Sequence, residues 1–335
     1  MLDALGSLGA TALKVAIIFG IFLTMVAYLV YVERKVLGHI QMRRGPLHVG
    51  FHGLLQPLAD GVKLFLKEDV IPEGADRALF ALAPAICVAT ALSTIAVIPF
   101  GESVTVLGRT IHLQIADLNI GILYILAVTS LGVYGIILGG WASNNKFALM
   151  GGLRSTAQVV SYELSLGLAL VGPLMLAGSL RMRTIIDAQA EVWFVVLQPL
   201  GFLIYLVSAL AETNRIPFDL AEAESELVAG YHVEYSGMKF AFFFLAEYAA
   251  MITVAAIATA LFLGGYHGIG FNSPWLGPVW FLAKMTLVLL VFIWIRGTLP
   301  RLRYDQLMRF GWKVLLPLSL INIMITGAVA LWRQG

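Results

Sequence analysis

The sequence contains little charge for its length. Only 13% of its 335 residues are charged and 59% are hydrophobic, whereas soluble globular domains carry about 25% charged residues. Folding alone cannot bury so much apolar surface, because even large domains leave much of their surface in water. The low charge therefore excludes an ordinary soluble domain and indicates that many side chains face lipid. The net charge of +2 gives no reason to expect a nucleic-acid partner.

Cysteine and histidine are scarce where a metal or cofactor would need them. The one cysteine, Cys87, lies inside an apolar run and is interpreted as a small buried hydrophobe. A single cysteine excludes an internal disulfide, an iron–sulfur cluster and a structural zinc site. None of the six histidines lies in the middle of an apolar run, which argues against a haem held between helices. We therefore expect no bound cofactor, and any redox reaction must draw its electrons from another chain.

Long apolar runs dominate the sequence. A bilayer-spanning helix needs about 20 mainly apolar residues, and the sequence predicts eight such spans. Their expected bounds are Thr11–Val32, Ala78–Phe100, Leu118–Gly140, Val159–Gly178, Val192–Ala211, Phe240–Gly264, Gly277–Ile295 and Val314–Trp332. These runs are continuously apolar and do not alternate as barrel strands do, so helices are favoured. The first run lacks a preceding basic stretch and a small-residue cleavage site, and is interpreted as a retained membrane helix.

The basic residues predict the orientation of these spans. Eight crossings place both termini on one side of the membrane. The connections after spans one, three, five and seven hold 7, 2, 2 and 5 of the 22 lysines and arginines. Because short cytoplasmic connections are enriched in Lys and Arg, these connections are predicted to be cytoplasmic and both termini to face outward.

The segment Leu54–Lys67 differs from the spans. Apolar residues recur at helical spacing, while polar residues follow another face. It is too polar to cross a bilayer and is predicted to be an amphipathic helix at the cytoplasmic interface. No internal repeat or low-complexity linker divides the chain. The predicted fold is therefore a single all-α integral membrane domain over residues 1–335, with eight transmembrane helices and this interfacial helix.

Acidic residues gather on the predicted cytoplasmic side. Six of the 20 acidic residues fall in one short stretch, with Arg215 as the only formal cation among them: Glu212, Asp219, Glu222, Glu224, Glu226 and Glu234. Two more, Glu163 and Glu247, lie inside predicted spans, where acidic side chains are costly and indicate function. If the three helices pack together, a row of carboxylates leads from the cytoplasmic loop into the membrane.

Such a row has a definite chemical use. Burial and neighbouring like charge both favour the protonated form of a carboxyl group, so coupled carboxylates share protons and titrate as a set. The row could pass protons or respond to a charge that appears nearby. The alternative is a solvated acidic loop with Glu163 and Glu247 paired to lysines or arginines. If residues 222–226 were helical, Glu222 and Glu226 would share a face and Glu224 would point away.

Several motifs in a fixed order resemble one known family, the H subunit of the bacterial proton-pumping NADH:quinone oxidoreductase (respiratory complex I). The stretches that carry the resemblance are Tyr31–Gly38 (YVERKVLG), Gln41–Pro46 (QMRRGP), Gly53–Asp69 (GLLQPLADGVKLFLKED), Gly151–Glu163 (GGLRSTAQVVSYE), Ala211–Asp219 (AETNRIPFD), Glu222–Gly237 (EAESELVAGYHVEYSG), Phe244–Tyr248 (FLAEY) and Arg296–Pro317 (RGTLPRLRYDQLMRFGWKVLLP). They cover all four predicted cytoplasmic connections, so their joint order is highly specific.

The resemblance implies a role inside a larger complex. It implies a subunit that docks the peripheral arm, forms much of the chamber where the substrate quinone is reduced, and couples that reduction to proton transport. The expected partners are the other membrane subunits, the peripheral-arm subunits, quinone and lipid, in a bacterial inner membrane. The complex would be an enzyme, whereas no activity is expected from the isolated chain.

The resemblance also assigns roles to individual residues. It places Glu33 and Arg34 near the quinone passage, Asp60 and Lys63 at its entrance, and Arg43 facing the peripheral arm. The eight acidic residues named above would couple proton and charge movement. Two departures from the family pattern stand out: Ala221 replaces a proline before the acidic loop, and Leu47 with His48 replaces a polar–basic pair.

Three alternatives stay open at this point. Related membrane-bound hydrogenases and ferredoxin- or formate-linked complexes contain similar subunits. A free-standing secondary transporter is disfavoured because such proteins often contain internal repeats and midplane sites. The third alternative is that the chain is a purely structural anchor. In that case, neutralising the carboxylates would alter assembly of the complex but never its turnover.

Overall fold

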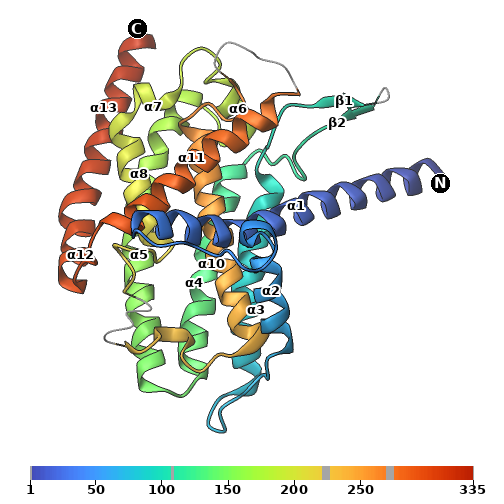
Figure 1. Ribbon diagram of the computed structural model, residues 1–335. Coiled ribbons are helices and arrows are strands. Elements are labelled where there is room, and N and C mark those ends of the chain that lie inside the picture. The colour runs from blue at the N-terminus through green and yellow to red at the C-terminus, as the bar shows by residue number, and fades with distance from the viewer. Residues whose placement is uncertain (1, 107–108, 221–226, 269–274, 335) are drawn as a thin grey trace. The chain divides into compact units, whose positions relative to one another are not determined.

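The computed structural model describes residues 2–106, 109–220, 227–268 and 275–334. The described chain is mostly helical (Figure 1), which confirms the predicted all-α membrane fold. It forms two compact units, Met1–Lys67 and Glu68–Gly335, which are treated separately below. The expectation of a single membrane domain therefore stays a prediction.

The first unit holds two α-helices joined by a loop. Helix α1 covers Leu2–Ile40, a 3-10 turn covers Phe51–Gly53, and α2 covers Gln56–Leu66. The predicted amphipathic helix is thus confirmed as a helix, with its apolar side chains, among them Leu58 and Val62, exposed. Its location at the membrane interface stays a prediction.

The second unit contains the remaining helices. The longer ones are α3 (Arg77–Thr94), α4 (Gly121–Ala142), α5 (Lys146–Ala177), α8 (Pro199–Glu212), α10 (Gly237–Leu261), α11 (Gly277–Thr298) and α13 (Leu316–Gln334). The short ones are α6 (Met182–Asp187), α7 (Phe194–Leu197) and α12 (Tyr304–Phe310), with 3-10 turns at Ile95–Val97 and Gly230–His232 and a π-helical turn at Gly311–Leu315. Strands β1 (Val104–Val106) and β2 (Arg109–Ile111) form a small antiparallel hairpin in register Val104 with Ile111, which the apolar pattern does not predict.

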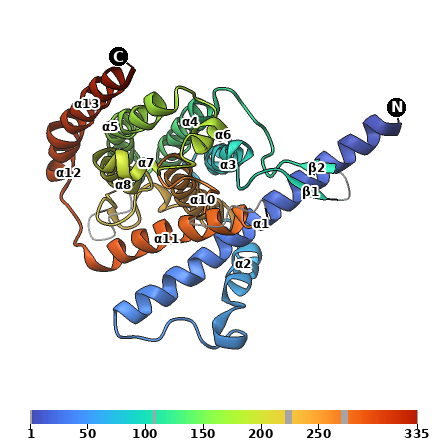
Figure 2. The same cartoon turned by 90° about the horizontal axis from the view of Figure 1, so that it is seen from above.

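Helix α10 lies at the centre of this unit. Seen from above, it lies among α3, α8 and α11 (Figure 2). Its second half is rich in small side chains that are completely buried, such as Ala249, Ala255 and Ala258. Small residues allow helix backbones to approach closely in membrane proteins, so this half of α10 provides the packing centre of the bundle.

Seven described helical segments are long and apolar enough to cross a membrane. They are Thr11–Ile40, Arg77–Val97, Gly121–Ala142, Lys146–Ala177, Gly237–Leu261, Gly277–Thr298 and Tyr304–Trp332. The eighth expected span, Val192–Ala211, is divided into α7 and α8 at Gln198, and Pro199 begins α8. Proline suits the first turn of a helix but not its interior, which accounts for the break. A count of eight crossings stays a prediction.

Helix α5 begins earlier than the apolar pattern predicts. It starts at Lys146 instead of Val159, because Asn145 caps its first turn by accepting a 2.8 Å hydrogen bond from the backbone N–H of Phe147. Its first half is polar, so a search for apolar runs could not detect it. Glu163 consequently lies near the middle of a 32-residue helix.

The loops of the second unit gather at its two ends. The β-hairpin and α6 lie at one end, and the connection between α4 and α5 lies at the other (Figure 1). This grouping is the one expected if the chain crosses the membrane back and forth between these helices.

Candidate functional site

The candidate site lies where α5, α8 and α10 bring carboxylates together. Glu163 is on α5, Glu212 ends α8 and Glu247 is on α10. Helices α5 and α8 pack against each other, so Glu163 and Glu212 lie on neighbouring helices. The Ser130 hydroxyl of α4 donates a hydrogen bond to Glu163 Oε1. The predicted packing of the helices that carry Glu163 and Glu212 is present in the structure, whereas the role of these carboxylates in coupling stays a prediction.

Glu247 is held by an arginine from the loop after α8. Arg215 Nε lies 2.6 Å from Glu247 Oε1, and the two side chains are 6% and 18% exposed. The Arg215 guanidinium also lies 4.3 Å from the centre of the Tyr248 ring, a distance typical of a cation–π contact. Glu247 therefore has the cationic partner that the structural alternative required, whereas no ion pair to Glu163 or Glu212 occurs among the described residues.

Asp219 is engaged by a second arginine. Arg301 Nη2 lies 2.8 Å from Asp219 Oδ2, and the Leu302 backbone N–H donates to the Pro217 carbonyl at 3.1 Å. These contacts fix the loop after α8 to the segment after α11. Asp219 thus anchors the loop that carries Arg215.

The other acidic residues of the loop do not join this group in the described structure. The Asn145 amide donates a 2.6 Å hydrogen bond to Glu234 Oε1, which places Glu234 at the start of α5. Glu222, Glu224 and Glu226, together with Ala221, lie outside the described residues. Of the predicted row, Glu212 and Glu247 line one cavity, while Glu163 lies on the neighbouring helix α5 and the row as a whole stays a prediction.

A partly buried histidine, His232, lies close to this region in sequence and stays neutral. His232 packs edge-on against the rings of Tyr231 and Phe240. Burial lowers the pKa of His232 to about 4, because desolvation disfavours the imidazolium. His232 is therefore uncharged at neutral pH and cannot act as a cationic partner for the carboxylates.

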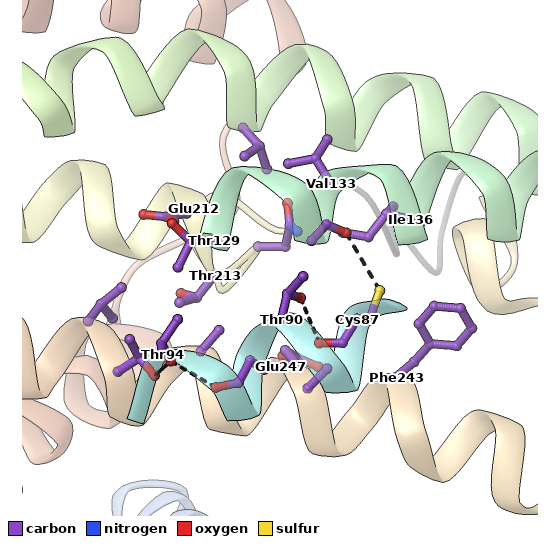
Figure 3. A pocket seen from close by; sticks show the side chains of 18 of the residues that line it. Cys87, Thr90, Thr94, Thr129, Val133, Ile136, Glu212, Thr213, Phe243 and Glu247 are labelled. Carbon is purple, nitrogen blue, oxygen red and sulfur yellow. Dashed lines mark hydrogen bonds between the residues drawn. The ribbon is translucent and has the colours of Figure 1, made fainter. Parts of the chain in front are cut away.

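A cavity connects Glu212 and Glu247. It offers about 110 Å³ to the centres of water-sized molecules, and one water needs roughly 10–15 Å³ of such space. Figure 3 shows Glu212 and Glu247 with hydroxyl side chains of α3 and α4 around the pocket. Its polar lining consists of Cys87, Thr90, Thr94, Thr129, Glu212, Thr213, Asn214, Tyr231, Glu247 and Thr253. Several water molecules can therefore bridge the two carboxylates.

The first unit carries the residues predicted near a quinone passage. Arg34 Nη1 on α1 lies 2.7 Å from Asp60 Oδ2 on α2, and the Gln56 amide donates to Asp60 Oδ1 at 3.0 Å. Glu33 precedes Arg34 on α1 and Lys63 is exposed on α2. The predicted Arg34 and Asp60 are thus brought together, while the roles of all four residues stay predictions.

A basic pocket lies beside this pair within the same unit. Its lining includes Arg34, Arg43, Arg44 and His48, and Arg43 Nε donates a 2.7 Å hydrogen bond to Gln41. His48, one of the departures from the family motif, therefore adds an imidazole to a group of three guanidinium side chains.

Sequence reasoning missed three features of the carboxylate site. Arg215 is the lone cation among the acids in the sequence, but its pairing with Glu247 depends on how the loop folds. Ser130 and the threonines of the cavity gave no signal, because isolated hydroxyl residues are common in membrane helices. The only sequence signal for Ser130 and these threonines is the recurrence of hydroxyl residues at helical spacing within the apolar runs.

The fold and the site together define a class: an all-α, multi-pass membrane protein in which partly buried carboxylates from two helical segments line a cavity. Within this class, the model of the NADH dehydrogenase family matches residues 13–327. The chain belongs to this family.

Curated relatives agree over nearly the whole length. The chain is 58% identical over 320 residues to the H 2 subunit of NADH-quinone oxidoreductase from Geobacter sulfurreducens, covering 95% of this chain and 96% of the relative. It is 57% identical over 321 residues to the H 1 subunit from Geobacter metallireducens, covering 96% of each. It is 52% identical over 334 residues to the H subunit from Syntrophotalea carbinolica, covering 99% and 100%. The predicted family is thereby confirmed.

Proposed function

We propose that the chain is the H-type membrane subunit of an NADH-quinone oxidoreductase and couples quinone reduction to proton translocation. The observation that supports this most directly is the cavity between Glu212 and Glu247, with Glu163 beside it. Carboxylates on three helices, joined through a hydrated space, share protons and respond together to a nearby charge. The relatives named above supply the oxidoreductase context.

The first unit is proposed to serve the quinone end of this reaction. Arg34 and Asp60 join α1 to the amphipathic α2, whose exposed apolar face suits a lipid-side entrance. In this proposal Glu33 and Lys63 line the passage and Arg43 faces the peripheral arm. The chain binds quinone and provides charged side chains along its passage. A neighbouring subunit supplies the electrons, because this chain is proposed to hold no redox cofactor.

The partners and the membrane follow from the same proposal. The chain assembles with the other membrane subunits and with the peripheral arm, contacts quinone and lipid, and binds no nucleic acid. It resides in the inner membrane of a bacterium, with both termini on the outer side. The basic connections between the spans support this orientation.

The carboxylates would transmit charge in a defined order. A negative charge appearing near Glu163 or Glu212 favours proton uptake there, because like charges stabilise the protonated carboxyl. Cavity water then connects Glu212 to Glu247, where Arg215 holds the acceptor in place. Asp219 and Arg301 keep the Arg215 loop in position.

Neutralising the acids in the assembled complex tests this proposal. We expect Glu163→Gln and Glu212→Gln each to lower coupled NADH:quinone activity and proton pumping at least tenfold, because an amide cannot take up the proton. Glu191→Gln is the matched control, since Glu191 is exposed in the connection between α6 and α7. Activity with an artificial electron acceptor that bypasses quinone should be unchanged in all three variants.

Two results would contradict the proposal. One is that Glu163→Gln, and Glu222→Gln combined with Glu226→Gln, leave both quinone reduction and pumping untouched. The other comes from gentle extraction of the native membrane and purification through this chain. Co-purified NADH-oxidising and iron–sulfur subunits support the proposal, a hydrogenase module moves the chain to the related complexes, and a chain that emerges alone reopens the transporter alternative.

A further inference from the structure

The connection between α2 and α3 is fastened to the start of α10. The backbone N–H of Val70 donates a 3.1 Å hydrogen bond to Ser236 Oγ, and this hydroxyl donates to the Glu68 carbonyl at 3.1 Å. Lys239 Nζ lies 2.8 Å from Asp69 Oδ2. The start of α10 therefore holds three successive residues of the connection. We call this set of contacts the α10 anchor.

The α10 anchor begins where the first compact unit of the chain ends. Helix α2 ends at Leu66, and the first unit ends at Lys67. The anchor thus holds the first residues of the second unit. Because Asp69 follows Leu66 by only three residues, any displacement of α2 acts on the anchor through the backbone itself. Residues at the ends of helices are the usual positions at which such movements are absorbed or passed on.

The lysine of the anchor also contacts a series of aromatic rings. Lys239 Nζ lies 5.1 Å from the centre of the Phe80 ring, within the range of a cation–π contact. The Phe80 ring stacks on the Tyr235 ring, with centroids 3.9 Å apart and planes inclined by 4°. The Tyr235 ring meets the Phe243 ring edge-on, with centroids 4.9 Å apart. Each of these four side chains is therefore in contact with the next.

The last ring of this series lines the carboxylate cavity. Phe243 and Glu247 both line the cavity, and Figure 3 shows Phe243 near Cys87 at one end of it. Phe243 and Glu247 are four residues apart on α10, so they lie on the same face of the helix. Packed side chains and one helix therefore connect the α10 anchor to the cavity, as in the contiguous networks that carry coupling between sites.

The ion pair of the anchor is too exposed to serve mainly as a source of stability. The side chains of Lys239 and Asp69 are 16% and 46% exposed, and ion pairs open to solvent are screened by water and salt. Loss of this pair should therefore leave the complex assembled. Its location, at the junction of the two units and at one end of the aromatic series, suits a positioning role.

We propose that Lys239 is a positioning residue that links movement of α2 to the placement of Glu247. When α2 shifts as quinone enters, Asp69 is carried with it, and the ion pair draws Lys239 and the start of α10 in the same direction. The inference rests on the proposed function, in which α2 lies at the quinone entrance and Glu247 takes part in coupling. It adds the residues through which the entrance and the cavity respond to each other.

The test separates coupling from assembly in the intact complex. Lys239→Met removes the charge from a side chain of similar length, and Asp69→Asn removes the partner charge while Lys239 stays over Phe80. Both variants are reconstituted in liposomes and driven by NADH, and protons pumped per NADH oxidised are measured together with kcat and KM for quinone. Arg181→Met is the matched control, because Arg181 and Asp117 form another partly exposed ion pair outside the anchor and the aromatic series.

We expect Lys239→Met and Asp69→Asn to lower the number of protons pumped per NADH by about twofold or more, the lower end of what single residues in coupling networks contribute. The KM for quinone should stay at its wild-type value, because neither residue is proposed to contact quinone. Lys239→Arg should keep the wild-type ratio, since a guanidinium can meet both the Asp69 carboxylate and the Phe80 ring. A merely structural role would lower turnover and pumping together and leave their ratio unchanged.

An unchanged ratio in both Lys239→Met and Asp69→Asn overturns the positioning role. An equal decrease in Arg181→Met, or in Lys239→Arg, also overturns it. Glu212→Gln in the same assay separates this failure from failure of the proposed function. If Glu212→Gln still lowers pumping while Lys239→Met leaves the ratio unchanged, only the link through Lys239 is wrong. If Glu212→Gln pumps normally, the role of the carboxylates is wrong.

Discussion

At the scale of single residues, the charge balance of the cavity depends on Arg215. This side chain is 6% exposed and joins Glu247 at 2.6 Å, so the ion pair is withdrawn from water. Removing one partner of a buried pair typically costs about 3–5 kcal/mol, because the other charge is left uncompensated. Ion pairs that are exposed to solvent contribute only about 0–1 kcal/mol to folding stability.

We expect Arg215→Met to lower the melting temperature of the purified complex and the yield of assembled complex on native gels. Adding Glu247→Gln should restore part of the loss, since the remaining carboxylate is then neutral. Arg181→Met is the control, because Arg181 pairs with Asp117 at the surface with side chains 43% and 29% exposed. Equal losses for Arg215→Met and Arg181→Met, or no recovery in the double variant, would show that this pair does not stabilise the site.

The acids of the site could be predicted from the sequence, but their partners could not. Acidic residues within apolar runs are rare enough to mark Glu163 and Glu247 directly. The partner of Glu247 depends on how the loop after α8 folds, and no periodicity encodes that path. The threonine hydroxyls were also invisible, because their importance arises only when four segments meet around one space.

At the scale of elements, the break between α7 and α8 is fixed by a polar contact inside the bundle. The Gln198 amide donates to Thr326 at 2.5 Å and accepts from Asn322 at 2.9 Å, which ties the break to α13. A Cβ atom on Gly172 of α5 would lie 2.6 Å from Gln198 Oε1. Only glycine therefore leaves room for this contact.

We expect Gly172→Ala to lower the melting temperature of the complex and to reduce assembly, because Gln198 must move from its two partners. Gly167→Ala is the matched control on the same helix, since a Cβ there meets nothing within 4 Å. It should be neutral or raise stability by up to about 1 kcal/mol through helix propensity. Equal stability of the two variants in thermal unfolding would contradict the proposed role of Gln198.

The helices themselves were largely predictable, and the exceptions have physical causes. Continuous apolar runs predict most long helices of the second unit, because a lipid environment requires them. They do not predict the polar first half of α5, since capping by Asn145, and not hydrophobicity, begins that helix. They also do not reveal the division at Gln198, because a proline within an apolar run is compatible with a kink, whereas Pro199 begins α8.

At the scale of the whole molecule, the sequence predicts the sidedness of the loops from charge alone. Most basic residues fall in alternate connections, and within the second unit the β-hairpin and α6 lie at the end opposite the α4–α5 connection. The two observations are independent, because one comes from charge and the other from the path of the backbone. Together they predict that Glu191 faces outward and Lys146 faces the cytoplasm.

The single cysteine makes this orientation directly testable. Cys87 is buried, so Cys87→Ser provides a background in which one new cysteine reports on one loop. Glu191→Cys should react with a membrane-impermeant thiol reagent in intact spheroplasts, whereas Lys146→Cys should react only after permeabilisation. Both positions are exposed, but Glu191 lies in the connection between α6 and α7 and Lys146 begins α5 at the opposite end of the unit. The reverse labelling would invert the topology. It would then place the carboxylates on the outer side, away from the cytoplasmic reaction to which they are proposed to be coupled.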